Sequence, residues 1–307
     1  MYPYKFQQIV RPLVWGVEKW MLSAFEQKLS VVSNGADAGK TITDLCREYR
    51  EQLLGQAVWE RTGERFPLLI KDIIARDKPS IQVHPDDALA RKRGFPCGKT
   101  EMWYVYDAEP GARLISGFSR NVSPEQYKTL VAEGRITDVL ASHSVAPGDA
   151  FFIPAGRIHA IGGGISLYEI QQTSDTTYRI FDYNRPGLDG KPRELHTEQA
   201  LDAIDYNVYD DYKGTLPVSC PYFTTEMLEA DSRKQLDLNN LDSFLILIGL
   251  SGSATLETAI PHGGPTKGHR TEIGEGELVL IPAAATGVTV IPEGGSARII
   301  TVNIQQQ

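Results

Sequence analysis

The chain has 307 residues, of which 41% are hydrophobic and 23% are charged, the composition of a soluble protein with one large or two smaller domains. Its formal net charge of −8 argues against nucleic acid or an anionic membrane as a partner. No apolar run is long enough to cross a bilayer. An anionic substrate would therefore need a local cluster of cationic side chains.

The N-terminal residues and the cysteines indicate where the protein works. Residues 1–10 have no apolar signal core and no small-residue cleavage site. The cysteines Cys46, Cys97 and Cys220 lie far apart and form no CxxC pair, which favours reduced thiols over a disulfide framework. A cytoplasmic location is expected.

Short β segments separated by Gly and Pro make up most of the chain, and they predict antiparallel barrels or sandwiches. The predicted strands lie at 66–75, 80–84, 101–108, 149–155, 243–250, 277–283 and 297–304. Three helices are predicted, at 41–55, 123–134 and 197–205. The second begins with Ser123 as N-cap and Pro124 in the first helical position.

A short internal repeat suggests two matched barrels. Residues 148–159 read GDAFFIPAGRIH, and residues 276–287 read GELVLIPAAATG. Periodicity is lost near 206–220, so the predicted division is a first domain with helical insertions at 1–215 and a second domain at 216–307. A chance similarity between two strand–turn segments is the alternative.

The first copy of the repeat carries a recognisable pattern of Gly148, Pro154, Gly156 and His159. This pattern resembles the second sequence motif of the cupin superfamily, whose jelly-roll barrels hold a metal inside. The resemblance implies a mainly β fold of two cupin-type jelly-roll barrels with a few short helices inserted. His159 would begin a strand directly after the Pro-Gly turn and point into the barrel.

Three further residues complete a possible metal site. Gln82 and His84 stand at i and i+2, on one face of a predicted strand, and Glu101 begins another strand. His84, Glu101 and His159, with Gln82 as a weaker fourth ligand, suit zinc, although Mn, Fe or Co also accept such ligands. A single buried histidine or glutamate is more often structural, but the joint placement on three strand ends favours a metal.

Four segments together give a more specific resemblance. Residues 67–87, 98–105, 148–162 and 168–185 resemble type I mannose-6-phosphate isomerases of the shorter bacterial branch, and residues 15–23 are also similar. The similarity covers nearly all of residues 1–205 and continues more weakly beyond them. It implies one zinc per chain, bound by His84, Glu101, His159 and Gln82.

The same resemblance implies that Arg179 is catalytic and that Lys71, Lys99 and Asp175 line the site. Longer members of the family often carry histidine before the lysine of the Lys-x-Glu motif, where this chain has Gly98. A mechanism that needs that histidine therefore cannot apply here.

The expected reaction interconverts mannose 6-phosphate and fructose 6-phosphate through an enediolate, whose negative charge a metal and a fixed cation would stabilise. Arg179 is permanently charged and suits this electrostatic role, although a surface ion pair with Asp175 or Asp182 is the alternative. Lys71 or Lys99 could act as the base or bind the phosphate, and the sequence does not separate these roles. The triglycine at 162–164 is a weak phosphate signal.

Two other functions remain open at this point. The chain could be a metal-dependent isomerase or epimerase of another sugar phosphate, or a non-catalytic bicupin that binds sugar. The partner expected in each case is a small molecule rather than nucleic acid or membrane, and nothing indicates the oligomeric state.

The C-terminal domain is expected to hold no metal. Gly287 occupies the position of His159 in the repeat, and residues 261–270 read as a mobile loop that contains His262 and His269. Contact of Lys267 and Arg270 with the phosphate is the functional alternative for this loop.

Overall fold

The computed structural model describes residues 1–187, 189–261 and 267–305, in a mainly β fold with short helices. The chain divides into two compact units. The first unit consists of Met1–Ile9, Met21–Leu69 and Leu216–Gln307, and the second of Val10–Trp20 and Ile70–Thr215. No helix in the described ranges is long and apolar enough to span a membrane.

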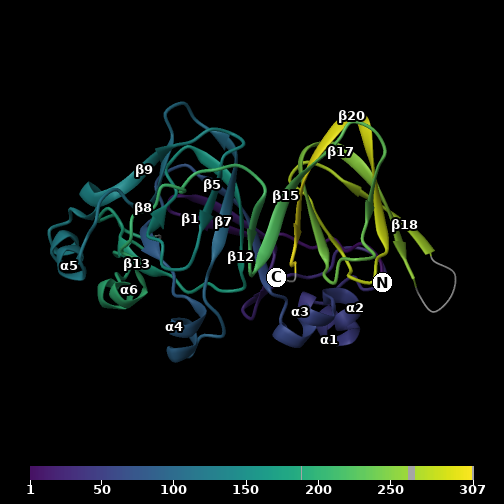
Figure 1. Ribbon diagram of the computed structural model, residues 1–307, viewed down its shortest axis with the longest axis horizontal. Helices are drawn as coiled ribbons and strands as arrows, with labels where there is room; N and C mark the ends of the chain where they lie inside the picture. The colour runs from purple at the N-terminus through teal and green to yellow at the C-terminus, as the bar shows by residue number, and fades with distance from the viewer. Residues whose placement is uncertain (188, 262–266, 306–307) are drawn as a thin grey trace. The chain divides into compact units, whose positions relative to one another are not determined.

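The second unit contains two sheets, both visible in Figure 1. The six-stranded sheet has the order β1 (Ile9–Leu13), β2 (Gly16–Leu22), β5 (Leu68–Ala75), β12 (Ile165–Gln172), β7 (Glu101–Ala108) and β10 (Ala150–Ile153). The five-stranded sheet has the order β13 (Tyr178–Phe181), β6 (Ile81–Val83), β11 (His159–Ala160), β8 (Arg113–Phe118) and β9 (Leu140–Ser144).

Two apolar clusters form the core of this unit, and the cluster on the six-stranded sheet also contains Leu114 of β8, from the other sheet. The core of the six-stranded sheet is built around Trp103, Phe151 and Leu167, which are fully buried. The core of the five-stranded sheet contains Phe118 and Ile180, and it extends to the helices that cover this sheet. Burial of these large side chains fixes which face of each strand points inward, since a slip of one residue would turn every side chain to the opposite face.

The helices of the second unit are α4 (Asp87–Lys92), α5 (Pro124–Ala132) and α6 (Thr197–Ala203), with a 3₁₀ turn, η1 (Ile136–Val139), after α5. The helices predicted at 123–134 and 197–205 are confirmed, and the Ser123 hydroxyl accepts a hydrogen bond from the Gln126 amide, as an N-cap should. Helix α4 was not predicted, and Asp86 caps it by accepting from the Leu89 amide.

The first unit is built on a seven-stranded sheet. Its main path runs β14 (Val218–Cys220), β15 (Phe223–Ala230), β20 (Gly287–Asn303), β17 (Leu245–Ile260) and β18 (Lys267–Ile273). Strand β16 (Lys234–Asp237) pairs with β20, β19 (Leu278–Ile281) pairs with β17, and β3 (Ala24–Phe25) pairs with β4 (Lys28–Leu29). The strands of the described residues form no closed barrel, so the predicted pair of jelly-roll barrels stays a prediction.

The repeat segments have matching local structures. Strand β10 is followed by a turn and by His159 at the start of β11, and strand β19 is followed by a turn and by Gly287 at the start of β20. The predicted loop at 261–270 needs correction. Residues 262–266, with His262, lie outside the described residues, but Lys267, His269 and Arg270 belong to β18, which pairs with β17 as an edge strand.

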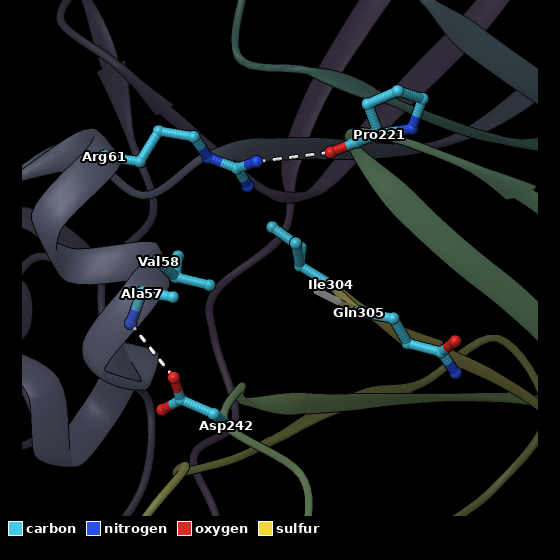
Figure 2. A pocket seen from close by; sticks show the side chains of 7 residues that line it. All are labelled: Ala57, Val58, Arg61, Pro221, Asp242, Ile304 and Gln305. Atoms are coloured by element: carbon cyan, nitrogen blue, oxygen red, sulfur yellow. Dashed lines mark hydrogen bonds between the residues drawn. The ribbon is translucent and has the colours of Figure 1, made fainter. Parts of the chain in front are cut away.

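One predicted helix is divided into two, and a third short helix follows it. The segment predicted as a helix at 41–55 forms α1 (Ile42–Tyr49) and α2 (Glu51–Leu54), and α3 (Gln56–Thr62) follows. The break falls at Arg50, whose φ of 47° is left-handed. In Figure 2, Asp242 lies at the start of α3 beside a pocket of about 230 Å³, where its carboxylate accepts from the Gln56 and Ala57 amides at 2.6 and 3.0 Å.

Candidate metal centre and adjoining cavity

The predicted metal ligands come from both sheets of the second unit. Gln82 lies on β6, and His159, at the start of β11, is its paired residue in the neighbouring strand. His84 follows the end of β6 by one residue, and its carbonyl accepts a hydrogen bond of 2.9 Å from the Gly156 amide in the Pro-Gly turn. Glu101 is the first residue of β7 in the six-stranded sheet.

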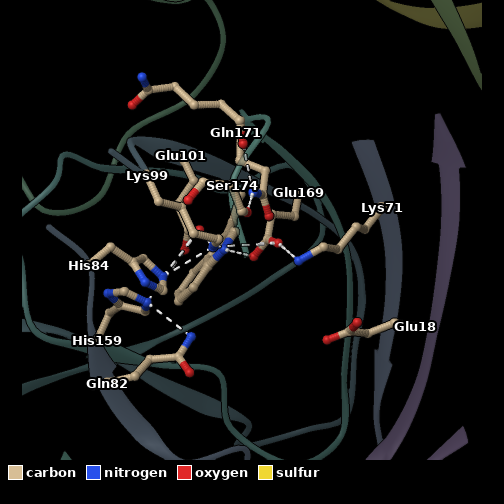
Figure 3. A network of polar contacts seen from close by, with 12 residues as sticks. Glu18, Lys71, Gln82, His84, Lys99, Glu101, His159, Glu169, Gln171 and Ser174 are labelled. Atoms are coloured by element: carbon tan, nitrogen blue, oxygen red, sulfur yellow. Dashed lines mark hydrogen bonds and ion pairs between the residues drawn. The ribbon is translucent and has the colours of Figure 1, made fainter. Parts of the chain in front are cut away.

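The two histidines present matching nitrogen atoms to Glu101 (Figure 3). Nδ1 of His84 is 2.9 Å from the Thr176 carbonyl, and Nδ1 of His159 is 2.8 Å from the Arg157 carbonyl, so Nδ1 donates in both rings. Nε2 is therefore the unprotonated nitrogen of each ring and can act as an acceptor or a ligand. The Nε2 atoms lie 3.5 and 3.4 Å from the two carboxylate oxygens of Glu101. One ligand atom from each residue falls within 4.8 Å of the others.

Burial and the charge of Lys99 set the protonation of these three side chains, which are all at most 1% exposed. It lowers the pKa of His84 to about 3, aided by the charge of Lys99, and it also lowers the pKa of His159. Burial alone would raise the pKa of Glu101, but the charge of Lys99 and contact with His84 hold it well below its ordinary value. Neutral imidazoles and an ionised carboxylate are the forms that bind a metal.

Lys99 and Gln82 also reach this centre. The Lys99 ammonium is 3.0 Å from Nε2 of His84 and forms a very short ion pair with Oε2 of Glu101. Oε1 of Glu101 is buried without a hydrogen bond to any residue in the described ranges. The side-chain amide of Gln82 lies 3.3 Å from Nε2 of His159. The positive charge of the Lys99 ammonium therefore lies close to the ligand atoms of His84 and Glu101.

A cavity of about 260 Å³ adjoins the centre and contains the remaining predicted residues. Lys71, Lys99, Asp175, Arg179 and Gln82 all line it. Residues from both sheets contribute to the lining. Four of its charged members were not predicted from the sequence: Arg11, Glu18, Glu169 and Arg193. Five cations and three carboxylates therefore face the cavity, a local excess of positive charge in a protein whose net charge is −8.

Glu169 links the two lysines of the cavity. Its Oε1 is 2.7 Å from Nζ of Lys71 and 3.9 Å from Nζ of Lys99, and its Oε2 accepts from Trp103 at 2.9 Å. Burial works against the charged form of Lys71, but the carboxylates of Glu169, Glu18 and Asp175 outweigh it and raise the pKa of Lys71. Glu169 is the one charged residue in the buried strand 165–172, which was the available signal for it.

Arg179 lies opposite Gln82 on the neighbouring strand, so both face the same cavity. Its guanidinium donates to the Glu194 carbonyl at 2.9 Å, and its Nε is buried without a hydrogen bond to any described residue. Asp182, offered as a possible ion-pair partner, instead receives two hydrogen bonds of 2.6 Å from Arg193, and Arg185 lies 3.0 Å away. Burial, followed by the charge of Arg193, lowers the pKa of Arg179.

Two glycine segments near the site have structural explanations. The Gly164 amide in the triglycine donates to the Ala75 carbonyl at 2.8 Å, and a side chain at Gly162 would collide with the Arg113 carbonyl, so this segment is a close-packed turn. A Cβ atom at Gly98 would lie 2.6–2.7 Å from the backbone of Pro85, Asp86 and Asp87. A histidine therefore does not fit at position 98 of this chain.

Comparisons with known proteins agree with this site. The family profile described as the phosphomannose isomerase type I catalytic domain matches residues 15–112. A mannose-6-phosphate isomerase of Streptococcus mutans is 34% identical over 261 residues, which cover 82% of this chain and 80% of the relative.

Two solved structures extend the similarity to the whole chain. The crystal structure of the mannose 6-phosphate isomerase from Bacillus subtilis has a TM-score of 0.85 at 28% identity, covering 98% of this chain and 99% of the other. A zinc-bound mannose 6-phosphate isomerase has a TM-score of 0.75 over both complete chains, and at 17% identity this likeness concerns the fold alone. The chain belongs to the type I mannose-6-phosphate isomerase family.

Proposed function

We propose that the chain interconverts mannose 6-phosphate and fructose 6-phosphate in the 260 Å³ cavity of its second unit. The observation that carries this proposal is the convergence of His84, His159 and Glu101 beside a cavity with excess positive charge, in a member of this isomerase family. A metal centre next to a cationic cavity suits a substrate that combines hydroxyl groups with a phosphate.

The residues present fit a divalent metal. Two neutral imidazole Nε2 atoms, one ionised carboxylate and the Gln82 amide form a mixed nitrogen and oxygen set, typical of catalytic zinc. The Nδ1 contacts to backbone carbonyls orient both rings, as second-shell partners of metal-binding histidines commonly do. We propose His84, Glu101, His159 and Gln82 as the ligands, and zinc as the metal. A divalent ion held there would supply Lewis-acid stabilisation of negative charge on the substrate.

The other cavity residues divide between charge stabilisation and proton transfer. Isomerisation removes a proton from C2 and returns one to C1, with negative charge on the oxygens in between. Lys71 remains a cation because its pKa is raised, so it suits the binding of negative charge rather than the role of base. Proton transfer is then left to Lys99, Glu169 or Asp175, which line the same cavity. Arg179 supplies a fixed charge that cannot be titrated away.

Arg179 and Arg193 are the residues best suited to bind the phosphate of the substrate. These two guanidinium groups are close enough for the charge of Arg193 to affect Arg179, and Asp182 is the carboxylate that holds Arg193. Nε and one terminal nitrogen of Arg193 bind Asp182, which leaves the second terminal nitrogen for a ligand. Paired guanidinium groups are well suited to a dianionic phosphate.

The other functions find less support. A non-catalytic sugar-binding protein has no need of a buried histidine–carboxylate centre beside paired lysines, and the named relatives are isomerases.

We also propose that the two sheets of the second unit form a cupin-type jelly roll, because the site draws residues from both of them. The cytoplasmic location stays a prediction.

A coupled assay tests this proposal directly. We expect turnover of mannose 6-phosphate to exceed that of other aldose 6-phosphates, to vanish after exhaustive chelation, and to return with one equivalent of zinc. Elemental analysis should find one divalent metal per chain. Full activity of a metal-free protein, or preference for another hexose phosphate, would refute it.

A further inference from the structure

Glu18 is a cavity-lining carboxylate that neither the metal centre nor the proton-transfer groups use. It lies on β2, its side chain is 13% exposed, and it shares the cavity with Lys71, Lys99 and Arg179. Figure 3 shows its carboxylate facing the same space as the ammonium of Lys71. A largely buried carboxylate is costly unless it has a partner, so the contacts of Glu18 indicate what role it has.

One oxygen of Glu18 is fixed by two donors. Oε2 accepts from Nε1 of Trp20 at 2.8 Å and from the guanidinium of Arg11 at 3.1 Å. Arg11 also lies over the Trp20 ring, 4.7 Å from its centroid. These contacts hold the carboxylate in one orientation without involving its second oxygen.

The second oxygen is open to the cavity. Oε1 of Glu18 has no hydrogen bond to any residue in the described ranges, and it is not among the buried atoms that lack a partner. Burial would raise the pKa of Glu18, but the charge of Lys71, the hydrogen bond from Trp20 and the charge of Arg11 lower it, so the group is an ionised acceptor. An ionised, oriented acceptor in a sugar-binding cavity matches a hydroxyl donor.

Apolar side chains also line the cavity. Leu13, Trp15 and Ile73 line the cavity together with Glu18. A sugar chain presents both C–H groups and hydroxyl groups, so a cavity that has apolar side chains and a fixed carboxylate in its lining complements its middle carbons. The phosphate, by contrast, would be repelled by Glu18.

We propose that Oε1 of Glu18 accepts a hydrogen bond from a hydroxyl group at C3, C4 or C5 of the hexose phosphate, and so helps to select the substrate. This inference rests on the proposed function, because it assumes that a hexose phosphate occupies the cavity. The competing role for Glu18 is to balance the charge of Lys71, which would give no preference among hydroxyl groups.

The test compares fructose 6-phosphate with three analogues that lack the hydroxyl at C3, C4 or C5 in turn. Their dissociation constants are measured with the wild-type holoenzyme and with Glu18→Gln. Wild type should bind one analogue about tenfold more weakly than fructose 6-phosphate, the loss typical of one charge-assisted hydrogen bond. Glu18→Gln should bind fructose 6-phosphate about tenfold more weakly than wild type does, and should no longer discriminate against that analogue.

Controls separate this role from others. Glu26→Gln alters an exposed glutamate and should behave as wild type. If Glu18→Gln does not fold in a thermal melt, Glu18→Asp keeps the charge, withdraws the oxygen, and should show the same pattern. An equal loss for all four ligands, or no loss, would overturn the proposal for Glu18 alone. A wild-type enzyme that does not bind fructose 6-phosphate would overturn the proposed function as well.

Discussion

Buried charges alternate in sign across the site. Lys71 contacts Glu169, which lies near Lys99, which in turn contacts Glu101. All four side chains are at most 5% exposed. Each charge would be costly in isolation, and well-packed apolar residues would often stabilise the fold equally well. The retention of four such charges beside a cavity therefore points to chemistry rather than to stability.

Replacement of Arg179 by lysine tests its electrostatic role. Lysine keeps the charge but loses the planar, fixed donors, so we expect the fold and metal content to be kept while kcat falls about 10²–10³-fold. Steady-state kinetics and metal analysis measure both effects. The exposed Arg135, changed to lysine in the same way, should be unaffected. A kcat near that of wild type would show that Arg179 is peripheral.

Asp182→Asn probes the carboxylate that organises Arg193 and Arg185. Burial works against its ionisation, but hydrogen bonds from both arginines lower its pKa. Because the folded-state pKa is depressed, the stabilisation is present above the unfolded value of about 3.9 and is lost as the pH falls through the folded value.

We therefore expect Asp182→Asn to lower the free energy of unfolding by about 1–3 kcal/mol at pH 7, and the difference from wild type to shrink below pH 4 or so. Urea unfolding at several pH values measures this difference. The exposed Asp231→Asn serves as control. A difference that stays constant down to acid pH would contradict the assignment.

At the scale of elements, strands and capped helices could be predicted from the sequence, whereas helix breaks and the pairing of strands could not. Strand β7 and helix α5 follow directly from apolar periodicity and from the Ser123 cap. The left-handed Arg50 that separates α1 from α2 has no signal in a segment with continuous helical periodicity. Strand β18 was missed because a Gly-rich sequence reads as a loop, although pairing with the long β17 supplies its backbone hydrogen bonds.

The same distinction applies to the site. His84, Glu101 and His159 could be predicted as ligands because each lies at the end of a strand or directly after a turn. The structure brings the three side chains together. Glu18 and Arg193 reach the cavity through strand order and loop path, which no local pattern encodes.

Gly98→Ala tests a close contact between two segments of the site. The Gly98 amide donates to Asp87 at 2.8 Å, and the Lys99 amide donates to the Pro85 carbonyl at 3.1 Å. A methyl group at position 98 would push against this backbone, so we expect a loss of about 1–3 kcal/mol in stability and weaker metal binding. Denaturant unfolding and metal titration measure these effects. Gly268→Ala, where a Cβ meets nothing within 4 Å, is the matched control, and equal behaviour of the two variants would exclude a tight contact.

At the scale of the whole molecule, charge is unevenly distributed. The chain carries −8 overall, yet the cavity lining has two more cations than carboxylates. Exposed charges farther than about 8–10 Å from a ligand are largely screened at physiological salt. A bound phosphate therefore experiences mainly the cavity, and an acidic surface is compatible with an anionic substrate.

Metal binding is expected in one part of the chain. The described residues offer one group of potential ligands, His84, Glu101 and His159, and it lies in the second unit. In the first unit, Gly287 begins β20 at the position that His159 has at the start of β11, and glycine has no ligating side chain. We therefore expect that His262→Ala combined with His269→Ala leaves one metal per chain and an unchanged kcat. The matched pair His84→Ala and His159→Ala should lose both, because it removes two of the three ligands. Metal loss in the first double variant would show that the site has been assigned to the wrong residues. A raised KM with normal metal content would instead support contact between this segment and the substrate.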